Sequence, residues 1–390
     1  MKAVCWYGAN DLRVVDVDEP KILNPRDAII RVGLSSVCGS DLHLIDGYIP
    51  TMQRGDIIGH EFMGEVVEVG SQVYNVRVGD RVVVPSIVAC GGCFYCHQEQ
   101  YSLCDNTNPN AAMLEAAFGY STAGIYGYSH LFGGYAGSHA EYIRIPFADV
   151  GAFVIPDGVT DEQALFCSDA FPTGFFAADN CDIQPGDIVA VWGAGAVGLF
   201  AMVSAYMLGA ERVIAIDRFP ERLNMAREFA NADTINYEEQ DDVVEILKQM
   251  TGGRGPDACI DAVGMEAHAG GLPGMYDKVK QTMRLETDRP HVLRQAIQAC
   301  RKGGTFSIVG VYAGLLDKLP MGAAFNKGLK FKMGQMHGQK YTGELLNRVA
   351  RGEVDPSRLI THRMSLDDAP KGYDLYKHKY EDCLRVVFAP

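Results

Sequence analysis

Four cysteines lie within fifteen residues of one another and could hold a metal ion. Cys90, Cys93, Cys96 and Cys104 follow the pattern C-x2-C-x2-C-x7-C. Four thiolates from one short loop can complete a tetrahedral shell with no open position, which is the geometry of a structural zinc site. The competing pattern, a bacterial iron–sulfur run, has three residues before its fourth cysteine and a proline after it, whereas seven residues and Asp105 stand here. The spacing therefore predicts structural zinc rather than a cluster or four unrelated thiols.

A second set of residues could bind a dinucleotide. Gly193, Gly195 and Gly198 lie between an apolar run and a helical pattern, in the order strand, turn, helix. In that setting the glycines allow a tight turn and bring a pyrophosphate close to unpaired N–H groups at the helix N-terminus. Asp217 stands nineteen residues past the last glycine, where a carboxylate binds the adenosine ribose, so we expect NAD rather than NADP. Arg218 beside it leaves NADP open, because an arginine can bind the additional phosphate.

Two further residues could be metal ligands, although each stands alone in its segment. Cys38 lies in the run VCGSDLH, and His60 lies in GHE. Taken singly, either residue is more often structural. Catalytic zinc, however, uses thiolate, imidazole and carboxylate ligands and keeps one position free. The residues alone leave both interpretations open.

The elements that must position these residues are of two kinds. The first ~150 residues contain short runs such as AIIRVGL and GEVVEVG between turn signals, which predicts a β-rich domain. From Asp187 strand-like and helical segments alternate, beginning with DIVAVWG, and this alternation predicts a parallel sheet with helices on both faces. A helix at 343–351 and a strand at 384–388 are expected to return to the first domain. The predicted fold class is α/β.

Composition and charge limit the class of protein. At 390 residues the chain is long enough for two domains, and its 47% hydrophobic and 22% charged residues are typical of globular proteins. The formal net charge of −14 argues against a nucleic-acid partner, since phosphate binding uses clustered lysine and arginine. The uncharged stretch 188–210 is long enough to span a membrane, but its glycines favour a buried strand and helix. The N-terminus has no secretory signal, so the eleven cysteines indicate thiols and metal ligands in a cytoplasmic protein.

Two segments are longer than the connections of compact domains usually are. They are residues 105–134, rich in glycine, alanine and aromatic residues, and residues 268–289, between a strand and a helix. Loops of this length are often functional. We expect both to border the active-site cleft and the second to cover the adenosine of a bound cofactor.

Over nearly its whole length the sequence resembles the zinc-containing medium-chain alcohol dehydrogenases. The resemblance is carried by CGSDLH, GHEFMGEVVEVG, VGDRVVVP, GGYAGSHAEYIRIP and WGAGAVG, together with the four-cysteine segment. Within that superfamily it is most similar to the formaldehyde dehydrogenase and formaldehyde dismutase branch, through SDAFPTGFFAA, CDNTNPNAA and the insertion after DAVGMEA. The resemblance implies a GroES-like, β-rich catalytic domain at 1–165 and 313–390, with the structural-zinc segment at 90–104. It also implies a doubly wound Rossmann domain for NAD at 166–312.

The resemblance further implies a catalytic zinc. Its ligands would be Cys38, His60 and Asp169, with Cys167 as the rival third ligand. Dehydrogenases of the liver type carry cysteine where Asp169 stands, so the aspartate favours the formaldehyde or polyol branches. The other catalytic residues would be Ser40 and His43, which pass the substrate proton toward the surface, Glu61, which approaches the zinc during turnover, and Asp41, which orients His60.

The remaining residues suggested by the resemblance surround the cofactor and the substrate. The cofactor contacts would be Thr173, Ala196, Val197, Val263, Gly310 and Arg385, the last of which would reach the pyrophosphate. Met336, His337 and the aromatic residues of 118–135 are candidates for the walls of the substrate pocket. Core packing explains these last residues equally well.

These residues together predict a zinc-dependent, NAD-linked dehydrogenase with one closed and one open zinc site. The substrate would be a small alcohol or a hydrated aldehyde, formaldehyde first, and NAD retained between turnovers would permit dismutation. The alternatives are a polyol, threonine or longer-chain alcohol dehydrogenase, and a non-catalytic binding protein that keeps the fold. The resemblance suggests a homotetramer or homodimer, and we expect no membrane or nucleic-acid partner.

Overall fold

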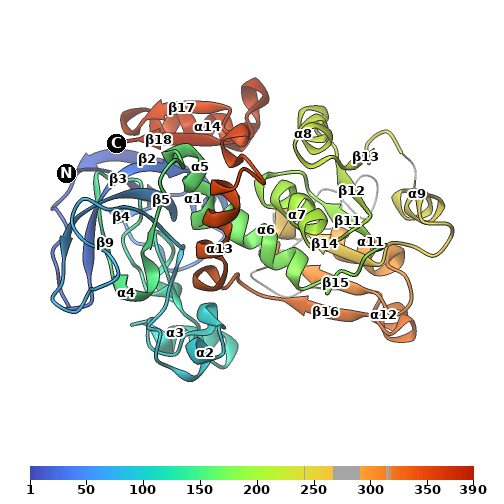
Figure 1. Ribbon diagram of the computed structural model, residues 1–390, viewed down its shortest axis with the longest axis horizontal. Helices are drawn as coiled ribbons and strands as arrows, with labels where there is room; N and C mark the ends of the chain where they lie inside the picture. Colours follow the sequence, from blue (N-terminus) through green and yellow to red (C-terminus); the bar gives the residue numbers. More distant parts are fainter. Residues whose placement is uncertain (241, 267–289, 313–315, 317) are drawn as a thin grey trace. The chain divides into compact units, whose positions relative to one another are not determined.

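The computed structural model describes residues 1–240, 242–266, 290–312, 316 and 318–390. They form two compact units, one of Met1–Pro172 with His337–Pro390 and the other of Thr173–Met336. Each unit has its own sheets and hydrophobic core (Figure 1). The predicted loop 268–289 lies outside the described residues.

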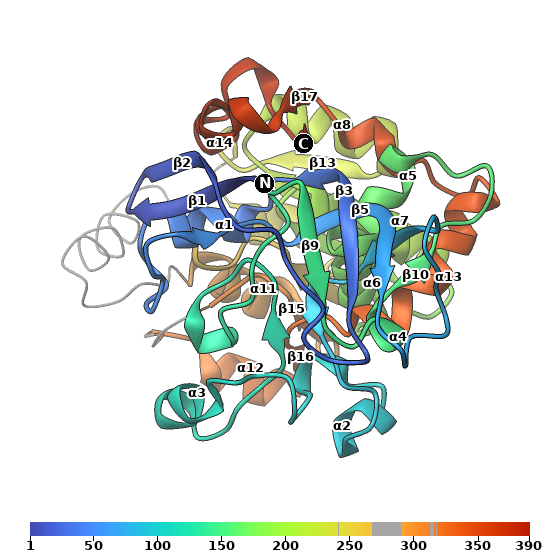
Figure 2. The same ribbon diagram turned by 90° about the vertical axis from the view of Figure 1, so that its left-hand side faces the viewer.

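The largest sheet of the first unit has seven strands. Its order is β10-β6-β5-β3-β18-β17, and β9 also pairs with β3. These strands are β3 (Ala28–Ser36), β5 (Glu61–Val69), β6 (Arg81–Val84), β9 (Tyr142–Ile145), β10 (Phe153–Val154), β17 (His362–Ser365) and β18 (Val386–Ala389). Figure 2 shows β9, β3 and β5 side by side. Because β18 pairs antiparallel with β3, the predicted return of the C-terminal strand is confirmed.

Alternating apolar residues explain why this sheet has a core. Ile30 and Val32 on β3, with Val82 and Val84 on β6, lie in one buried cluster. Residues two apart on a strand point to the same face, so these runs bury one face together. Smaller sheets are β2-β1-β4, formed by β1 (Lys2–Gly8), β2 (Asp11–Asp16) and β4 (Asp56–Ile57), and the pair of β7 (Ile87–Val88) with β8 (Gly124–Ile125).

Short helices connect the strands of the first unit. They are α1 (Gly39–Ile45), α2 (Phe94–His97), α3 (Ala111–Phe118), α4 (Ala148–Gly151), α5 (Asp161–Leu165), α13 (Gly338–Ala350) and α14 (Ala369–His378). The predicted helix at 343–351 is the later part of α13. The long segment 105–134 contains α3 and β8, so it is not a structureless loop.

The second unit is built on a six-stranded parallel sheet of order β13-β12-β11-β14-β15-β16. Its strands are β11 (Ile188–Trp192), β12 (Arg212–Asp217), β13 (Asp233–Asn236), β14 (Ala258–Asp261), β15 (Thr305–Ile308) and β16 (Lys330–Met333). The predicted parallel sheet is confirmed. The uncharged stretch 188–210 contains β11 and α7 (Ala196–Met207), and no helix among the described residues is long and apolar enough to cross a membrane.

Helices cover both faces of this sheet, as the alternation predicts. Side chains of α9 (Val243–Met250), α11 (His291–Ala299) and α12 (Met321–Lys327) form one core with Ala190 and Trp192 of β11. The helices α7 and α8 (Pro220–Ala230) contact β12. A further helix, α6 (Ala170–Asp179), begins in the first unit and continues into the second.

The second unit extends further along the chain than the sequence suggests. We expected its end near residue 312, whereas β16 pairs with β15 and the unit ends at Met336. The sequence gives little warning of β16, because the strand has four residues and none of them is buried. A short edge strand of this kind carries no clear alternating pattern.

Candidate metal centres and cofactor turn

The four-cysteine site consists of Cys90, Cys93, Cys96 and Cys104, which all lie buried in the first unit. Their sulfur atoms lie within 4.8 Å of one another, with Cys90 and Cys96 at 4.0 Å and Cys93 and Cys104 at 3.8 Å. Such distances are close to those of four thiolates around one zinc ion, with Zn–S bonds of about 2.3 Å. The neighbouring His97 is exposed and lies outside the group. The donor set therefore fits a closed zinc site.

Backbone and side-chain N–H groups surround the sulfur of Cys90. Burial opposes its ionisation, but the N–H of Gly92 at 3.4 Å and the amide of Asn106 at 3.5 Å donate hydrogen bonds to it. Together the donors lower the pKa of Cys90 to about 7. Metal ligands must be deprotonated, so these donors favour metal binding at Cys90. Burial instead raises the pKa of the Cys96 and Cys104 thiols in the same group.

A second group of possible ligands brings together residues that are far apart in the sequence. The ligand atoms of Cys38, His60 and Asp169 lie within 4.8 Å of one another, and Cys38 Sγ is 3.9 Å from Asp169 Oδ2. Cys38 caps α1, His60 directly precedes β5, and Asp169 precedes α6. The rival ligand Cys167 lies outside this group, and burial raises the pKa of its thiol. One thiolate, one imidazole and one carboxylate fit a zinc site with a position left open.

Ser40 stands directly beside these ligand atoms. Its Oγ is 3.3 Å from Cys38 Sγ and 3.2 Å from His60 Nε2. His43 lies on the same helix, one turn further along. We expected His43 near the surface, but it is only 5% exposed. The reason is that α1 is covered by the core around Leu42 and Ile45.

Asp41 lies next to the imidazole of His60. Its Oδ1 is 3.1 Å from His60 Nδ1, and its Oδ2 accepts a hydrogen bond of 2.9 Å from the N–H of Cys38. Burial would raise the pKa of Asp41, but His60 and the Cys38 N–H outweigh burial and lower it. A carboxylate on Nδ1 leaves Nε2 free to face a metal. Asp41 is therefore a charged group at the base of the candidate site.

A buried ion pair adjoins the same site. Glu61 Oε1 accepts a hydrogen bond of 2.7 Å from Arg385 Nη2, and Arg385 Nη1 donates to the carbonyl of Val37. Burial raises the pKa of Glu61 to about 7, although Arg385 opposes the shift. Arg385 is 1% exposed. The prediction that Arg385 reaches a pyrophosphate gains no support from these contacts, because both Nη atoms are engaged within the first unit.

The predicted glycine turn joins β11 to α7 in the second unit. Gly193 has φ of +92°, a conformation that favours glycine. A Cβ on Gly198 would lie 1.8 Å from the carbonyl oxygen of Gly193, so only glycine fits there. Gly195 precedes the first residue of α7, Ala196, and the N–H groups of this helix end are suited to bind phosphate.

Asp217 is the last residue of β12, and Arg218 follows it. Asp217 Oδ2 accepts a hydrogen bond of 2.7 Å from the N–H of Ala194, which ties the carboxylate to the glycine turn. Arg218 Nη1 is 3.1 Å from Glu238 Oε1, and its guanidinium lies over the ring of Phe219. The aspartate is thus held beside the turn, while the arginine is paired with a carboxylate.

The remaining predicted cofactor residues of the second unit lie on two helices and after two strands. Val197 belongs to the first turn of α7, and Thr173 belongs to α6. Val263 and Gly310 follow β14 and β15, neighbouring strands whose carboxyl ends share one edge of the sheet. That edge is where open parallel sheets bind ligands. The binding roles of these residues stay predictions.

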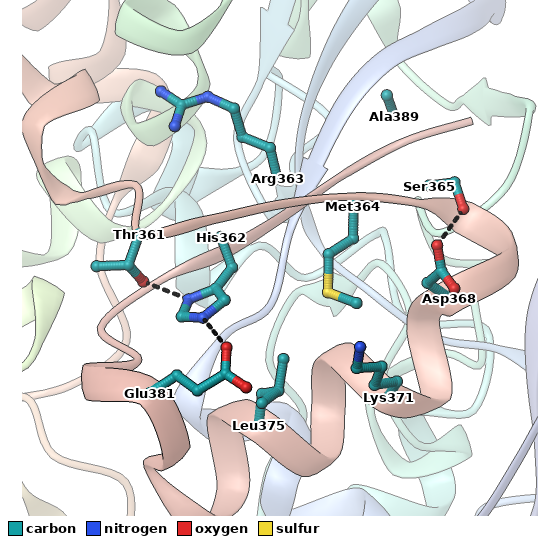
Figure 3. Close-up of a pocket in the computed structure, with 10 residues that line it drawn as sticks. All are labelled: Thr361, His362, Arg363, Met364, Ser365, Asp368, Lys371, Leu375, Glu381 and Ala389. Carbon is teal, nitrogen blue, oxygen red and sulfur yellow. Dashed lines mark hydrogen bonds and ion pairs between the residues drawn. The ribbon is translucent and has the colours of Figure 1, made fainter.

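The first unit also has a surface depression that none of these residues lines (Figure 3). It has a volume of about 760 Å³ and is lined by β17, α14 and the residues that follow α14. His362 lies 2.9 Å from Thr361 Oγ1 and 3.6 Å from Glu381, and Arg363 pairs with Glu162. It contains none of the predicted metal ligands or cofactor residues.

Comparison with known proteins identifies the family. Residues 24–157 match the alcohol dehydrogenase GroES-like domain, and residues 196–269 match the zinc-binding dehydrogenase domain. The chain is 40% identical over the full length of both chains to an uncharacterized zinc-type alcohol dehydrogenase-like protein, AdhB, of Bacillus subtilis. It is 33% identical to a glutathione-independent formaldehyde dehydrogenase of the same organism, over 95% of this chain and 93% of the other.

A solved structure agrees with this result. The alcohol dehydrogenase TADH from Thermus sp. ATN1 superposes with a TM-score of 0.83 at 35% identity, covering 100% of this chain and 99% of that one. The chain therefore belongs to the zinc-type alcohol dehydrogenases, a family of oxidoreductases within the medium-chain superfamily. The predicted GroES-like and Rossmann folds are confirmed.

The structure adds residues that the sequence did not reveal. Ser86, beyond the end of β6, donates a hydrogen bond of 2.6 Å to Asp169 Oδ1. Tyr373 on α14 donates one of 3.0 Å to Asp41 Oδ2, across 332 residues of sequence. No local pattern marks either residue, because each acts through a contact that exists only in the folded chain.

Proposed function

We propose that this protein is a zinc-dependent, NAD-linked dehydrogenase that oxidises a small alcohol or a hydrated aldehyde, with formaldehyde as the first candidate. The observation that carries the proposal is the convergence of Cys38, His60 and Asp169 on one point, with Ser40 beside them. Three protein ligands leave a position for substrate, whereas the four-cysteine site leaves none. We propose zinc at both sites, two ions per chain.

In the proposed reaction, side chains of this protein hold the zinc ion and accept the proton of the substrate hydroxyl group. Zinc held by the three ligands would polarise the substrate oxygen, and NAD would accept the hydride. Ser40 Oγ, 3.2 Å from His60 Nε2, is close enough to the ligands to accept the proton of a hydroxyl group presented there. His43, on the same helix, would take that proton onward. Asp41 lies 3.1 Å from Nδ1 of His60 and would hold its imidazole, and the Glu61–Arg385 ion pair lies next to the ligand His60 in the chain.

The proposed chemistry can oxidise a hydrated aldehyde, and it does not require a cysteine nucleophile in the enzyme. Hydrated formaldehyde is a gem-diol, so loss of one hydroxyl proton to Ser40 and of one hydride to NAD yields formic acid. The same two losses convert an alcohol to an aldehyde. Asp169 and the formaldehyde dehydrogenase relative favour formaldehyde as the first substrate to test.

NAD is proposed over NADP because of the charges beside the glycine turn. Asp217 is held there by the N–H of Ala194, and its negative charge would repel a 2′-phosphate. Arg218 pairs with Glu238, which leaves its charge partly neutralised. Whether NAD stays bound between turnovers, as dismutation requires, is tested by the cofactor content of protein purified without added NAD.

The test combines metal analysis with a substrate panel. We expect about two zinc ions per chain and NAD-dependent oxidation of formaldehyde, with ethanol and sorbitol as comparison substrates. Faster turnover of ethanol or sorbitol would instead identify a longer-chain alcohol or polyol dehydrogenase. One zinc ion per chain without activity on the panel would contradict the proposal and favour a binding protein. Sedimentation of the same protein tests the proposed homodimer or homotetramer.

A further inference from the structure

A buried chain of hydrogen bonds runs behind the Cys38–His60–Asp169 site. Asp41 Oδ2 accepts a hydrogen bond of 3.0 Å from the hydroxyl of Tyr373. The same hydroxyl lies 2.8 Å from His139 Nε2, and His139 Nδ1 lies 2.6 Å from Ser35 Oγ. The four residues come from α1, α14, the segment before β9, and β3. Their contacts therefore link distant parts of the first unit to a group that touches a metal ligand.

The direction of each hydrogen bond follows from the chemistry of the groups. Since the Tyr373 hydroxyl donates to Asp41, His139 Nε2 must donate to the tyrosine oxygen, which leaves Nδ1 as an acceptor. Ser35 Oγ lies 2.6 Å from that Nδ1, and it also donates to the carbonyl oxygen of Glu61 at 3.2 Å. Burial lowers the pKa of His139 to about 4, which is consistent with one proton on the ring at neutral pH. The hydrogens of His139 Nε2 and of the Tyr373 hydroxyl therefore both point toward the carboxylate of Asp41.

Burial distinguishes this chain from a proton path. Ser35, Asp41 and His139 are 0% exposed, and Tyr373 is 3% exposed. Ser35 contacts Ser138 Oγ at 2.9 Å, and that residue is buried as well. The chain thus ends inside the first unit, so it can fix the orientation of Asp41 but offers no exit for a proton along its length.

Packing holds the His139 ring in one place. A Cβ on Gly59 would lie 2.6 Å from ring atoms of His139, so the imidazole lies flush against the backbone that precedes His60. The ring of Phe388 lies edge-on to the His139 ring, and the two ring centroids are 5.2 Å apart. A ring confined in this way can direct its Nε2–H at Tyr373 with little freedom to turn.

The helix α14 brings Tyr373 to this position. Lys371 and Leu375, four residues apart, line the depression drawn in Figure 3, whereas Tyr373 between them is buried. A helix places residues i and i+4 on one face and residue i+2 on the opposite side. The inner face of α14 therefore supplies a single hydroxyl to Asp41.

We propose that Tyr373, oriented by His139, is a positioning residue of the zinc site: its hydroxyl fixes the Asp41 carboxylate so that His60 turns Nε2 toward the metal. The inference rests on the zinc that the proposed function assigns to Cys38, His60 and Asp169. Asp41 touches His60 Nδ1 at 3.1 Å and also accepts the Cys38 N–H. Removal of the Tyr373 hydroxyl leaves Asp41 Oδ2 with one hydrogen-bond donor, the N–H of Cys38, so the buried carboxylate has a less defined orientation.

The experiment measures zinc affinity in Tyr373→Phe, which removes one hydroxyl and keeps the ring. A chelator is titrated into the zinc-loaded enzyme, and the four-cysteine zinc serves as the reference within the same chain. We expect about tenfold weaker binding at the open site, unchanged binding at the four-cysteine site, and an altered visible spectrum after Co²⁺ substitution. The matched control is Tyr206→Phe, which removes a hydroxyl bound to Asn231 and Val213 in the other unit and should change none of these.

Two further variants keep the test decisive. His139→Leu should weaken zinc binding like Tyr373→Phe, whereas His139→Gln, whose amide can still donate to the tyrosine, should largely restore it. If Tyr373 acts through Asp41, the tyrosine change should add little to Asp41→Asn in a double-mutant cycle. Wild-type zinc affinity and Co²⁺ spectrum in Tyr373→Phe, or simple additivity with Asp41→Asn, would overturn the inference. A wild-type enzyme with only one zinc would contradict the proposed function itself.

Discussion

The two candidate zinc sites of the first unit differ most in what surrounds their ligands. The four cysteines are enclosed by backbone and amide N–H groups, such as those of Gly92 and Asn106 on Cys90. The Cys38–His60–Asp169 site is instead surrounded by charged groups, Asp41 behind His60 and the Glu61–Arg385 pair beside it. A zinc site with four cysteine ligands and no open position needs only enough hydrogen-bond donors to stabilise four thiolates. An open shell must also hold each ligand in a fixed direction, because the substrate takes the remaining position.

The sequence separations of the ligands match this difference. The four-cysteine ligands come from one segment with two short helical turns, so few tertiary contacts are needed to assemble them. Cys38 and Asp169 are 131 residues apart and are brought together only by the tertiary fold of the first unit. The four-cysteine site can therefore stabilise its own segment of the chain, whereas assembly of the Cys38–His60–Asp169 site depends on the fold of the whole first unit.

The largest effect should come from removing an open-site ligand. His60→Ala should lower kcat/KM by about three orders of magnitude, or ~4 kcal/mol, because the Lewis acid would be lost or misplaced. Metal analysis should find close to one zinc per chain, retained by the four cysteines. The matched control is Cys167→Ser, a buried residue outside the ligand group. Equal losses of activity in both variants would show that the site is not a metal centre.

The second prediction concerns the loss of one ligand from the four-cysteine site. Cys93→Ser should lower the free energy of unfolding by ~3 kcal/mol, since metal binding at a structural site contributes to folding. The Tm measured by calorimetry should fall, whereas kcat/KM per folded molecule should change little. A large loss of kcat with an unchanged Tm would reverse the roles assigned to the two sites.

A smaller effect is expected from the residue beside the open site. Ser40→Ala should lower kcat about a hundredfold and leave zinc content unchanged, because a proton acceptor contributes about 10² to 10⁴ in rate. KM should change less than kcat. Ser86→Ala is a useful companion, since it removes a hydrogen bond to Asp169 without removing the proposed proton acceptor. If Ser40→Ala instead loses zinc and keeps its rate, the serine is part of the metal's support.

Local patterns made some features predictable from the sequence. The four cysteines have the spacing of a complete ligand set, and Gly193, Gly195 and Gly198 stand between a strand and a helix. Such features depend on residues that are neighbours along the chain. The parallel sheet was predictable for the same reason, because each strand and the helix after it carries its own periodicity.

Features made by distant contacts were not predictable in this way. The grouping of Cys38 with Asp169 came only from a family resemblance, because neither residue marks the other in sequence. The ion pair of Arg385 with Glu61, 324 residues away, had no signal in the sequence, and the contact of Arg385 with a pyrophosphate stays a prediction. Tyr373 and His139 gave no signal, since the hydrogen bonds of Tyr373 with Asp41 on α1 and with His139 before β9 arise only from tertiary packing.

The smallest expected effect tests which property separates the two sites, the type of ligand or the open position. Asp169→Cys gives the open site a second thiolate and makes its ligand set more like that of the four-cysteine site. We expect two zinc ions per chain and a kcat within about tenfold of wild type, because three ligands and one free position remain. A thiolate transfers more charge to zinc than a carboxylate, and Ser86 would lose its acceptor, so a modest decrease is expected rather than none. We would measure kcat and the zinc content on the same preparation of Asp169→Cys. The same two quantities would be measured for Asp169→Asn as the comparison variant. Complete loss of activity with both zinc ions retained would mean that the carboxylate itself, and not the open position, distinguishes this site.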